Sequence, residues 1–252
     1  MTRINEMNRT IKLTLLASAF ALAAGTASAE VYNLCAAEST KTLPDGSTVP
    51  VWGYAMDENG DLADGCQDTA GAPAAVTLPG PRLKVTDGTL TVNLRNDLPE
   101  PTSLVIPGLP MPDSGIAGPD GNGPVFVEPG TGATSNARTT PTQRVRSFGA
   151  EAAPGGIESY TFSVNRPGTF LYHSGTHPQK QVYMGLHGAA TRNAVEADTD
   201  AGTPAEAYPG VEYFNEVVLF YSEIDPDLNS SIACLYDADG ILPDGSLCGI
   251  DV

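Results

Sequence analysis

Three histidines and one methionine share a single short segment of this sequence. His173, His177 and His187 are the only histidines of the chain and fall within fifteen positions, with Met184 between the last two. Imidazole is the commonest protein ligand for transition metals, and thioether sulfur suits copper in particular. The segment therefore predicts a copper site. The alternative is that His173 is only a histidine at a strand end and Met184 fills the core.

The first 29 residues have the pattern of a secretory signal peptide. Arg3, Arg9 and Lys12 form a basic start, residues 13–24 are an apolar run, and Ala27-Ser28-Ala29 provides a cleavage signal. The run of about twelve residues is too short for a bilayer span, which needs roughly 20. We therefore expect no membrane span, and export to the periplasm or the medium.

The mature chain is strongly acidic. Removing Arg3, Arg9, Lys12 and Glu6 leaves 10 Lys+Arg against 29 Asp+Glu, a net charge of −19. Nucleic acid and anionic lipid surfaces need the opposite sign, so neither is an expected partner.

Four cysteines are present: Cys35, Cys66, Cys234 and Cys248. An even number in an exported protein predicts disulfides, and four cysteines allow three pairings. The local pairs Cys35–Cys66 and Cys234–Cys248 are favoured because each closes a loop within one terminal segment. None of the four lies near a histidine.

The remaining pattern is that of a β protein. Short alternating runs lie at 49–55, 83–86, 89–95, 103–106, 158–164, 169–173, 182–187 and 215–222. Such runs predict an antiparallel sandwich or barrel. If 182–187 is a strand, Met184 and His187 face opposite ways, so only one can share a site with the other histidines.

Long loops and one helix complete the prediction. Residues 107–141 and 194–209 look like irregular surface loops. A helix is predicted from an N-cap at Asp225 and Pro226, with Leu228, Ile232 and Leu235 on one face. We therefore divide the chain into a signal peptide (1–29), a β domain (30–225) and a helix with a disulfide-closed tail (226–252).

The same five residues occur once near each end of the chain. Leu43-Pro-Asp-Gly-Ser47 follows Cys35 at the same distance as Leu242-Pro-Asp-Gly-Ser246 follows Cys234. Two unrelated hairpins with a favoured Asp-Gly turn are the simpler explanation. A second copy of the N-terminal element that begins and then stops is the alternative.

Several motifs resemble the N-terminal cupredoxin domain of multicopper oxidases. The stretch 166–174 is similar to the family's second histidine motif, and Gln181 with 185–188 is similar to the sequence that follows it. The stretches 79–96 and 154–162 are similar to the opening of that domain and to the strand before its second motif. The resemblance covers most of 52–190 and implies a cupredoxin-like Greek-key β-sandwich.

The chain departs from the family at its ligand positions. Val105 and Pro107 stand where the resemblance implies the first histidine pair, and neither can bind a metal. His173 matches the first ligand of the second pair, whereas Gly175 stands at the next unless 175–176 is an insertion and His177 is the displaced partner, which we prefer. At most half of this domain's share of a trinuclear copper cluster remains.

These departures define three hypotheses. The first is an exported copper-binding protein that uses His173, His177 and either His187 or Met184. The second is a non-catalytic module for assembly or partner binding. The third is one part of a split or truncated oxidase, with partner domains elsewhere. Because no cysteine accompanies the histidines, we expect no blue copper centre and no oxidase activity from this chain alone. Whether the chain forms a homo-oligomer stays open.

Overall fold

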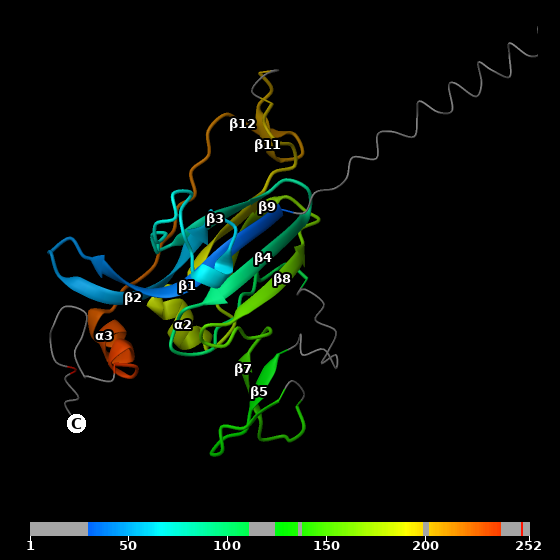
Figure 1. Ribbon diagram of the computed structural model, residues 1–252. Coiled ribbons are helices and arrows are strands. Elements are labelled where there is room, and N and C mark those ends of the chain that lie inside the picture. The colour runs from blue at the N-terminus through cyan, green and yellow to red at the C-terminus, as the bar shows by residue number, and fades with distance from the viewer. Residues whose placement is uncertain (1–29, 111–123, 136–137, 199–201, 238–247, 249–252) are drawn as a thin grey trace, which may run out of the picture.

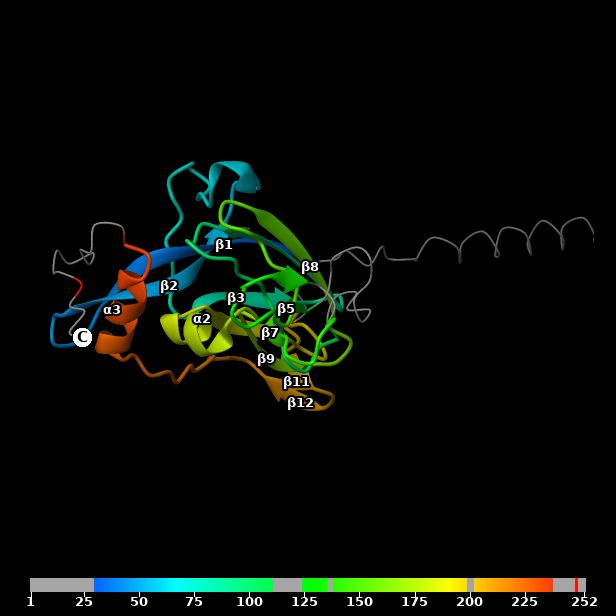
Figure 2. The ribbon, with the colours of Figure 1, turned by 90° about the horizontal axis from the view of Figure 1, so that it is seen from below.

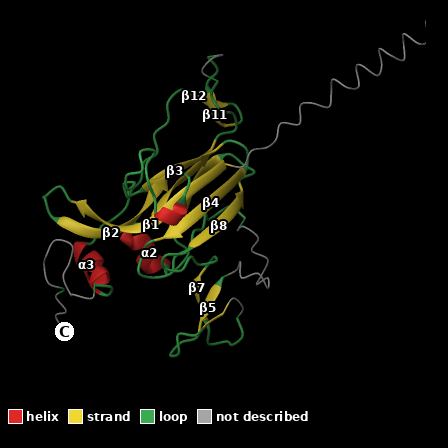
Figure 3. Cartoon of the chain, in the orientation of Figure 1, coloured by secondary structure: helices red, strands yellow, loops and turns green. Residues whose placement is uncertain are grey.

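A computed structural model describes residues 30–110, 124–135, 138–198, 202–237 and 248 (Figure 1). The predicted signal peptide lies outside these residues. The protein is mostly β (Figure 3), which confirms the predicted all-β class with a short C-terminal helix. The strands are β1 (Glu30–Thr42), β2 (Thr48–Asp57), β3 (Gly80–Val85), β4 (Thr89–Asn96), β5 (Val125–Val127), β6 (Thr134–Ser135), β7 (Arg144–Ser147), β8 (Ile157–Ser163), β9 (Gly168–His173), β10 (His187–Arg192), β11 (Ala205–Tyr208) and β12 (Val211–Tyr213). The helices are the 3-10 turn η1 (Leu62–Asp64), α2 (Pro178–Met184) and α3 (Pro226–Cys234).

Two sheets form the sandwich. One has the strand order β2-β1-β4-β8 and the other β3-β10-β9. Alternate residues of β4 are buried, as period-two alternation predicts for a strand with one face in the core. The pairing is mixed, because β1 runs parallel to β4 and β3 parallel to β10. The antiparallel pairing expected from the sequence holds only for the other neighbours.

The core lies between these sheets and reaches the helices at one end. Its fully buried large side chains include Trp52, Tyr54, Phe162, Tyr172 and Met184. Trp52 also packs against Tyr236, just after α3, with ring centroids 5.8 Å apart. Figures 1 and 2 show α2 and α3 next to β2 at the same end of the molecule.

The loop predictions need correction. Within 107–141, β5 and β6 form a small separate sheet with β7, which follows this range, and within 194–209, β11 pairs with β12 just beyond it. The predicted strand at 215–222 is extended chain without strand pairing, and the one at 182–187 is the end of α2 and the residues that follow it.

The helix α3 begins as predicted but presents a different face. The Asp225 side chain accepts hydrogen bonds from the backbone N–H groups of Asp227 and Leu228, which is an N-cap. Leu228 and Leu235 are exposed, however, and Asn229 is buried with Ile232. The Asn229 amide donates to the carbonyl of Pro50 at 2.9 Å, so a hydrogen bond to β2 determines which face is buried.

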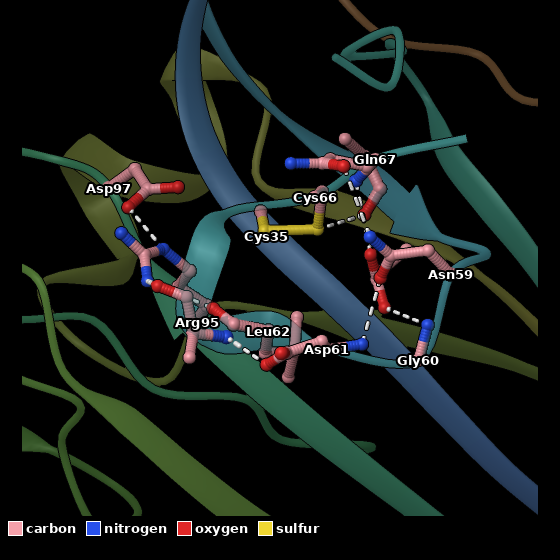
Figure 4. The surroundings of a disulfide bond; sticks show 12 residues. Cys35, Asn59, Gly60, Asp61, Leu62, Cys66, Gln67, Arg95 and Asp97 are labelled. Atoms are coloured by element: carbon pink, nitrogen blue, oxygen red, sulfur yellow. Dashed lines mark hydrogen bonds and ion pairs between the residues drawn. A yellow bond between two sulfur atoms is a disulfide. The ribbon is translucent and has the colours of Figure 1, made fainter. Parts of the chain in front are cut away.

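Both disulfides have the favoured local pairing. Cys35 is bonded to Cys66, and Cys234 to Cys248. The first ties β1 to the loop that carries η1 (Figure 4). Arg95 of β4 supports the same loop by donating to the carbonyl of Leu62 at 2.9 Å. No helix among the described residues is long and apolar enough to cross a membrane.

Candidate functional site

The two stretches that resemble the family's histidine motifs lie next to each other. Val105 forms an isolated bridge with His173: the Val105 N–H donates to the His173 carbonyl at 2.9 Å, and the His173 N–H donates back at 3.0 Å. Residues 103–106 therefore do not form the predicted strand, but they run beside the end of β9. The two stretches thus lie side by side, joined by this pair of backbone hydrogen bonds.

The space between these stretches is filled. A Cβ atom at Gly175 would lie 2.7 Å from a methyl carbon of Val105 and 2.9 Å from the hydroxyl oxygen of Ser103. Both distances are too short for real contacts, so no larger side chain fits at position 175 without displacing its neighbours. Val105 is itself buried. Packing therefore excludes a metal ligand at Gly175.

Hydroxyl groups occupy the adjoining interior. The Thr176 hydroxyl oxygen lies 3.0 Å from the hydroxyl oxygens of both Ser103 and Ser147 and 3.1 Å from the Glu151 carboxylate, so it can donate one hydrogen bond and accept others. Ser103 and Ser147 are 2.8 Å apart, and all three hydroxyl residues are buried. Because these groups satisfy one another, the cluster needs no bound ion to compensate its burial.

A second part of this network surrounds Gln181 of α2. The Gln181 side-chain oxygen accepts from Thr102 at 2.7 Å and from Ser174 at 2.5 Å, while its nitrogen donates to Glu100 at 2.7 Å. Lys180 forms an ion pair with Glu100. Burial by itself would raise the pKa of Glu100, but hydrogen bonds from Lys180 and its neighbours outweigh it, so the pKa is lowered.

Tyr236 closes this part of the network after α3. Its hydroxyl donates to Glu100 at 2.5 Å and accepts from the Lys180 ammonium at 2.6 Å. The buried side chains of α2 are thus joined to the C-terminal helix. We call the hydroxyl cluster and the Gln181–Glu100 group together the buried polar network.

His173 and His187 form a cross-strand pair. They are directly opposite in the antiparallel ladder of β9 and β10. The next pair makes the ladder hydrogen bond, from the Ser174 N–H to the Leu186 carbonyl at 3.0 Å. The histidines therefore occupy a non-hydrogen-bonded position, where opposite side chains are on one face and closest together.

The ring orientation of both histidines is defined by backbone carbonyls. The Nδ1 atom of His173 lies 2.7 Å from its partner, the carbonyl oxygen of Ser174. The Nδ1 atom of His187 lies 3.3 Å from the carbonyl oxygen of Val182. A carbonyl oxygen only accepts, so each Nδ1 carries a proton, and in the neutral form of each ring the lone pair is on Nε2. Histidines that bind a metal through one ring nitrogen commonly donate from the other to a carbonyl or carboxylate oxygen in this way.

A cavity of about 430 Å³ adjoins His187. Phe220 lines it together with the histidine, and their ring centroids are 5.8 Å apart. His187 is only 8% exposed, and burial lowers its pKa, with the nearby His173 as a further cause. The imidazole of His187 is therefore neutral, as metal binding requires, at neutral pH.

His177 and Met184 are placed differently. His177 precedes α2 with a left-handed backbone (φ 38°), and its N–H donates to the carbonyl of Arg146 at 2.9 Å. Burial lowers its pKa, as does the neighbouring charge of Lys180. Met184 is fully buried in the hydrophobic core. Because 178–184 is helical, the predicted alternation of Met184 and His187 along a strand is wrong.

The structure thus brings together two of the four predicted ligands. Within the described ranges, no group of three or more His, Cys, Asp or Glu side chains could hold a metal ion. His177 accordingly does not complete a three-ligand site with His173 and His187. The sequence also gave no signal for the hydroxyl cluster, because Ser103, Ser147 and Thr176 come from distant positions.

Comparisons with solved structures return copper proteins of low identity. The chain is similar to a multicopper oxidase from Pseudomonas thermotolerans (22% identity, 68% of this chain, 32% of the other, TM-score 0.44). It is also similar to a multicopper oxidase from Campylobacter jejuni (22%, 68% and 27%, TM-score 0.40) and to the copper nitrite reductase of Nitrosomonas europaea (21%, 65% and 40%, TM-score 0.36). The match thus covers at most two fifths of each of these chains. No protein-family model and no curated protein matches the chain.

Proposed function

We propose that this chain is an exported copper-binding protein that holds copper through the Nε2 atoms of His173 and His187. One observation carries the proposal: the two rings are cross-strand neighbours, and a backbone carbonyl binds the Nδ1 side of each. In the proposed site, the Nε2 lone pairs of the two rings bind one ion.

The pair suits copper by its chemistry. Imidazole nitrogen is a good copper ligand, and copper(I) accepts two ligands, so a pair is sufficient. Bound copper would supply one-electron redox chemistry. The protein's own part is to orient both imidazoles through their Nδ1 atoms, and to keep His187 neutral and sheltered beside Phe220. Such a site suits buffering or delivery of copper, and no multi-electron oxidation follows from it.

A non-catalytic module is the second candidate. The contact between Val105 and Gly175 and the buried polar network favour it, because they convert the family's ligand frame into ordinary packed interior. In this account the sandwich serves assembly or partner binding, including partner oxidase domains on another polypeptide. The histidine pair would then have no ligand.

Copper affinity of matched variants separates the two candidates. Purified protein is titrated with copper(I) in competition with a chromophoric chelator. We expect binding by the wild type, loss of binding in His173→Ala/His187→Ala, and retained affinity in the control His177→Asn. Asn tolerates the left-handed backbone at position 177. Circular dichroism checks that each variant is folded. Equal affinity of wild type and double variant would favour the non-catalytic module.

Export is supported by the basic and apolar pattern of residues 1–29 and by the two disulfides, which belong to an oxidising compartment. The intact mass of protein recovered from the periplasm or medium tests this directly. We expect a product that begins at or near Glu30. A product that retains residues 1–29 would contradict it.

A further inference from the structure

The connection between β12 and α3 lies against His187. Residues 214–224 leave the β11–β12 hairpin and run along the outside of the domain to the start of α3, the orange connection in Figures 1 and 2. On this path the Phe220 ring meets the His187 ring, with their centroids 5.8 Å apart. Residues 220–223 also line the cavity beside His187, together with side chains of β9 and α2. We call residues 214–224 the strap.

Few interactions hold the strap against the domain. Among the described residues, no backbone group of the strap makes a hydrogen bond with another backbone group. Phe214, Val217, Leu219 and Tyr221 are between 69% and 90% exposed, so burial of their apolar surface contributes little. A segment with few buried contacts and no backbone hydrogen bonds opens locally at a low cost in free energy.

Two side-chain contacts attach the middle of the strap. Glu216 forms an ion pair with Arg82 of the edge strand β3 and accepts from the Tyr213 hydroxyl at 3.3 Å. The other contact is that of Phe220 with His187, which is only 8% exposed. The ends are fixed by regular structure, because β12 pairs with β11 and the strap leads into α3. The strap can therefore lift in the middle while both ends stay in place.

We infer that the strap is a latch over His187, in which Phe220 closes the approach to the imidazole and the Arg82–Glu216 ion pair holds the strap closed. The regulatory consequence rests on the proposed function, since copper must reach the same ring. When the strap lifts, the Phe220 ring leaves His187 and the cavity wall at 220–223 opens to solvent. The ion pair is partly exposed, so salt screens it and increases the open fraction. The latch thus controls how fast copper enters and leaves the site.

The test measures the accessibility of His187 in the copper-free protein. Diethyl pyrocarbonate modifies neutral imidazole, and peptide mass spectrometry gives the modification rate of each histidine at a single neutral pH. We expect a slow rate for His187 in the wild type. Glu216→Gln should raise this rate about two- to fivefold, the range of a partly exposed ion pair. Phe220→Ala should raise it about tenfold, because the ring contact is lost. The rate of His177, which does not line the cavity, should be the same in all variants.

The matched control is Glu196→Gln. It removes an ion pair with Lys84 on the same strand β3 but leaves the strap unchanged, so the His187 rate should equal that of the wild type. High salt should raise the rate in the wild type and not in Glu216→Gln. Equal His187 rates in the wild type, Glu216→Gln and Glu196→Gln would overturn the latch, even if Phe220→Ala reacts faster, because Phe220 would then only cover the ring.

Copper release separates the latch from the proposed function. Transfer of copper(I) from the protein to an excess of chelator should be faster in Glu216→Gln by the same factor as the modification of His187. An unchanged release rate would contradict control of copper exchange by the strap. If the wild type binds no copper, the proposed function fails, whereas the modification rates still decide whether the strap opens as a latch.

Discussion

His173 and Ser174 are adjacent residues, yet they belong to two contrasting regions. Ser174 points into the buried polar network, where Gln181 and Thr102 satisfy its hydroxyl group. His173 faces the other way and pairs with His187, and each ring is oriented through its Nδ1 atom. Hydrogen bonds close the first region, whereas in the second the Nε2 atoms have no hydrogen-bond partner in the part of the chain that the structure describes.

This difference shows that side chains at one strand end can lie in opposite environments. The space around Val105 and Gly175 is packed and leaves no room for a larger side chain at position 175. The pair at His173 and His187 depends only on the register of two strands. A resemblance in motif therefore does not by itself locate the functional atoms.

The largest expected loss of stability follows from a substitution of Glu100, at the charged end of the buried polar network. Glu100→Gln should destabilise the protein by about 2–3 kcal/mol at neutral pH, because Lys180 and Tyr236 lose a charged partner. Chemical denaturation measures this, with exposed Glu38→Gln as control. The lowered pKa of Glu100 means that its contribution is present above about pH 4.5 and is lost as the pH falls further. A difference that persists at lower pH would contradict this.

Filling the space beside Gly175 should lower the free energy of unfolding by slightly less. Gly175→Ala is expected to destabilise by about 1–3 kcal/mol, because the new methyl group meets Val105 and Ser103. In a double-mutant cycle, Val105→Ala should relieve part of that cost. Strictly additive changes in unfolding free energy would show that the two positions are not in contact.

Removing one hydroxyl tests whether the network is closed by mutual hydrogen bonds. Thr176→Val keeps the shape but leaves Ser103, Ser147 and Glu151 with one partner fewer. We expect a loss of about 1–2 kcal/mol. Thr161→Val, which removes an exposed hydroxyl, should change stability by less than about 0.5 kcal/mol. Equal effects in thermal melts would argue against a specific buried network.

The smallest effect concerns pH in the metal-free protein. Burial lowers the pKa of His177 and of His187, so their unfolded forms bind protons more readily. Stability should therefore be full above about pH 6.5 and fall on acidification below it. The variant His177→Asn/His187→Gln should show a flatter profile in denaturation between pH 7.5 and 5. An unchanged slope would refute this.

Much of the fold could be predicted because it follows local rules. Alternation along 89–95 and 158–164 predicts β4 and β8, and Asp225-Pro226 predicts the start of α3. The prediction of a strand at 182–187 was wrong, because the N–H groups of Lys180 and Gln181 donate to the His177 carbonyl and so start the helix α2, which continues to Met184. The alternating run 215–222 pairs with no strand among the described residues, although Glu216 contacts Arg82 of the edge strand β3.

The candidate site was only partly predictable. Clustering identified His173 and His187, but sequence could not show that they are cross-strand neighbours, because that depends on the register of β9 and β10. The preference for His177 came from motif spacing, whereas its backbone turns into α2. The hydroxyl cluster depends on long-range contacts that leave no local pattern.

The most direct test of the histidine pair is a nitrogen-15 NMR spectrum of the imidazole rings during titration with copper(I). The chain has only three histidines, so each ring can be followed separately. We predict that the Nε2 signals of His173 and His187 shift together while those of His177 stay unchanged. Shifts of His177 together with His173, or no shift in any ring, would contradict the account.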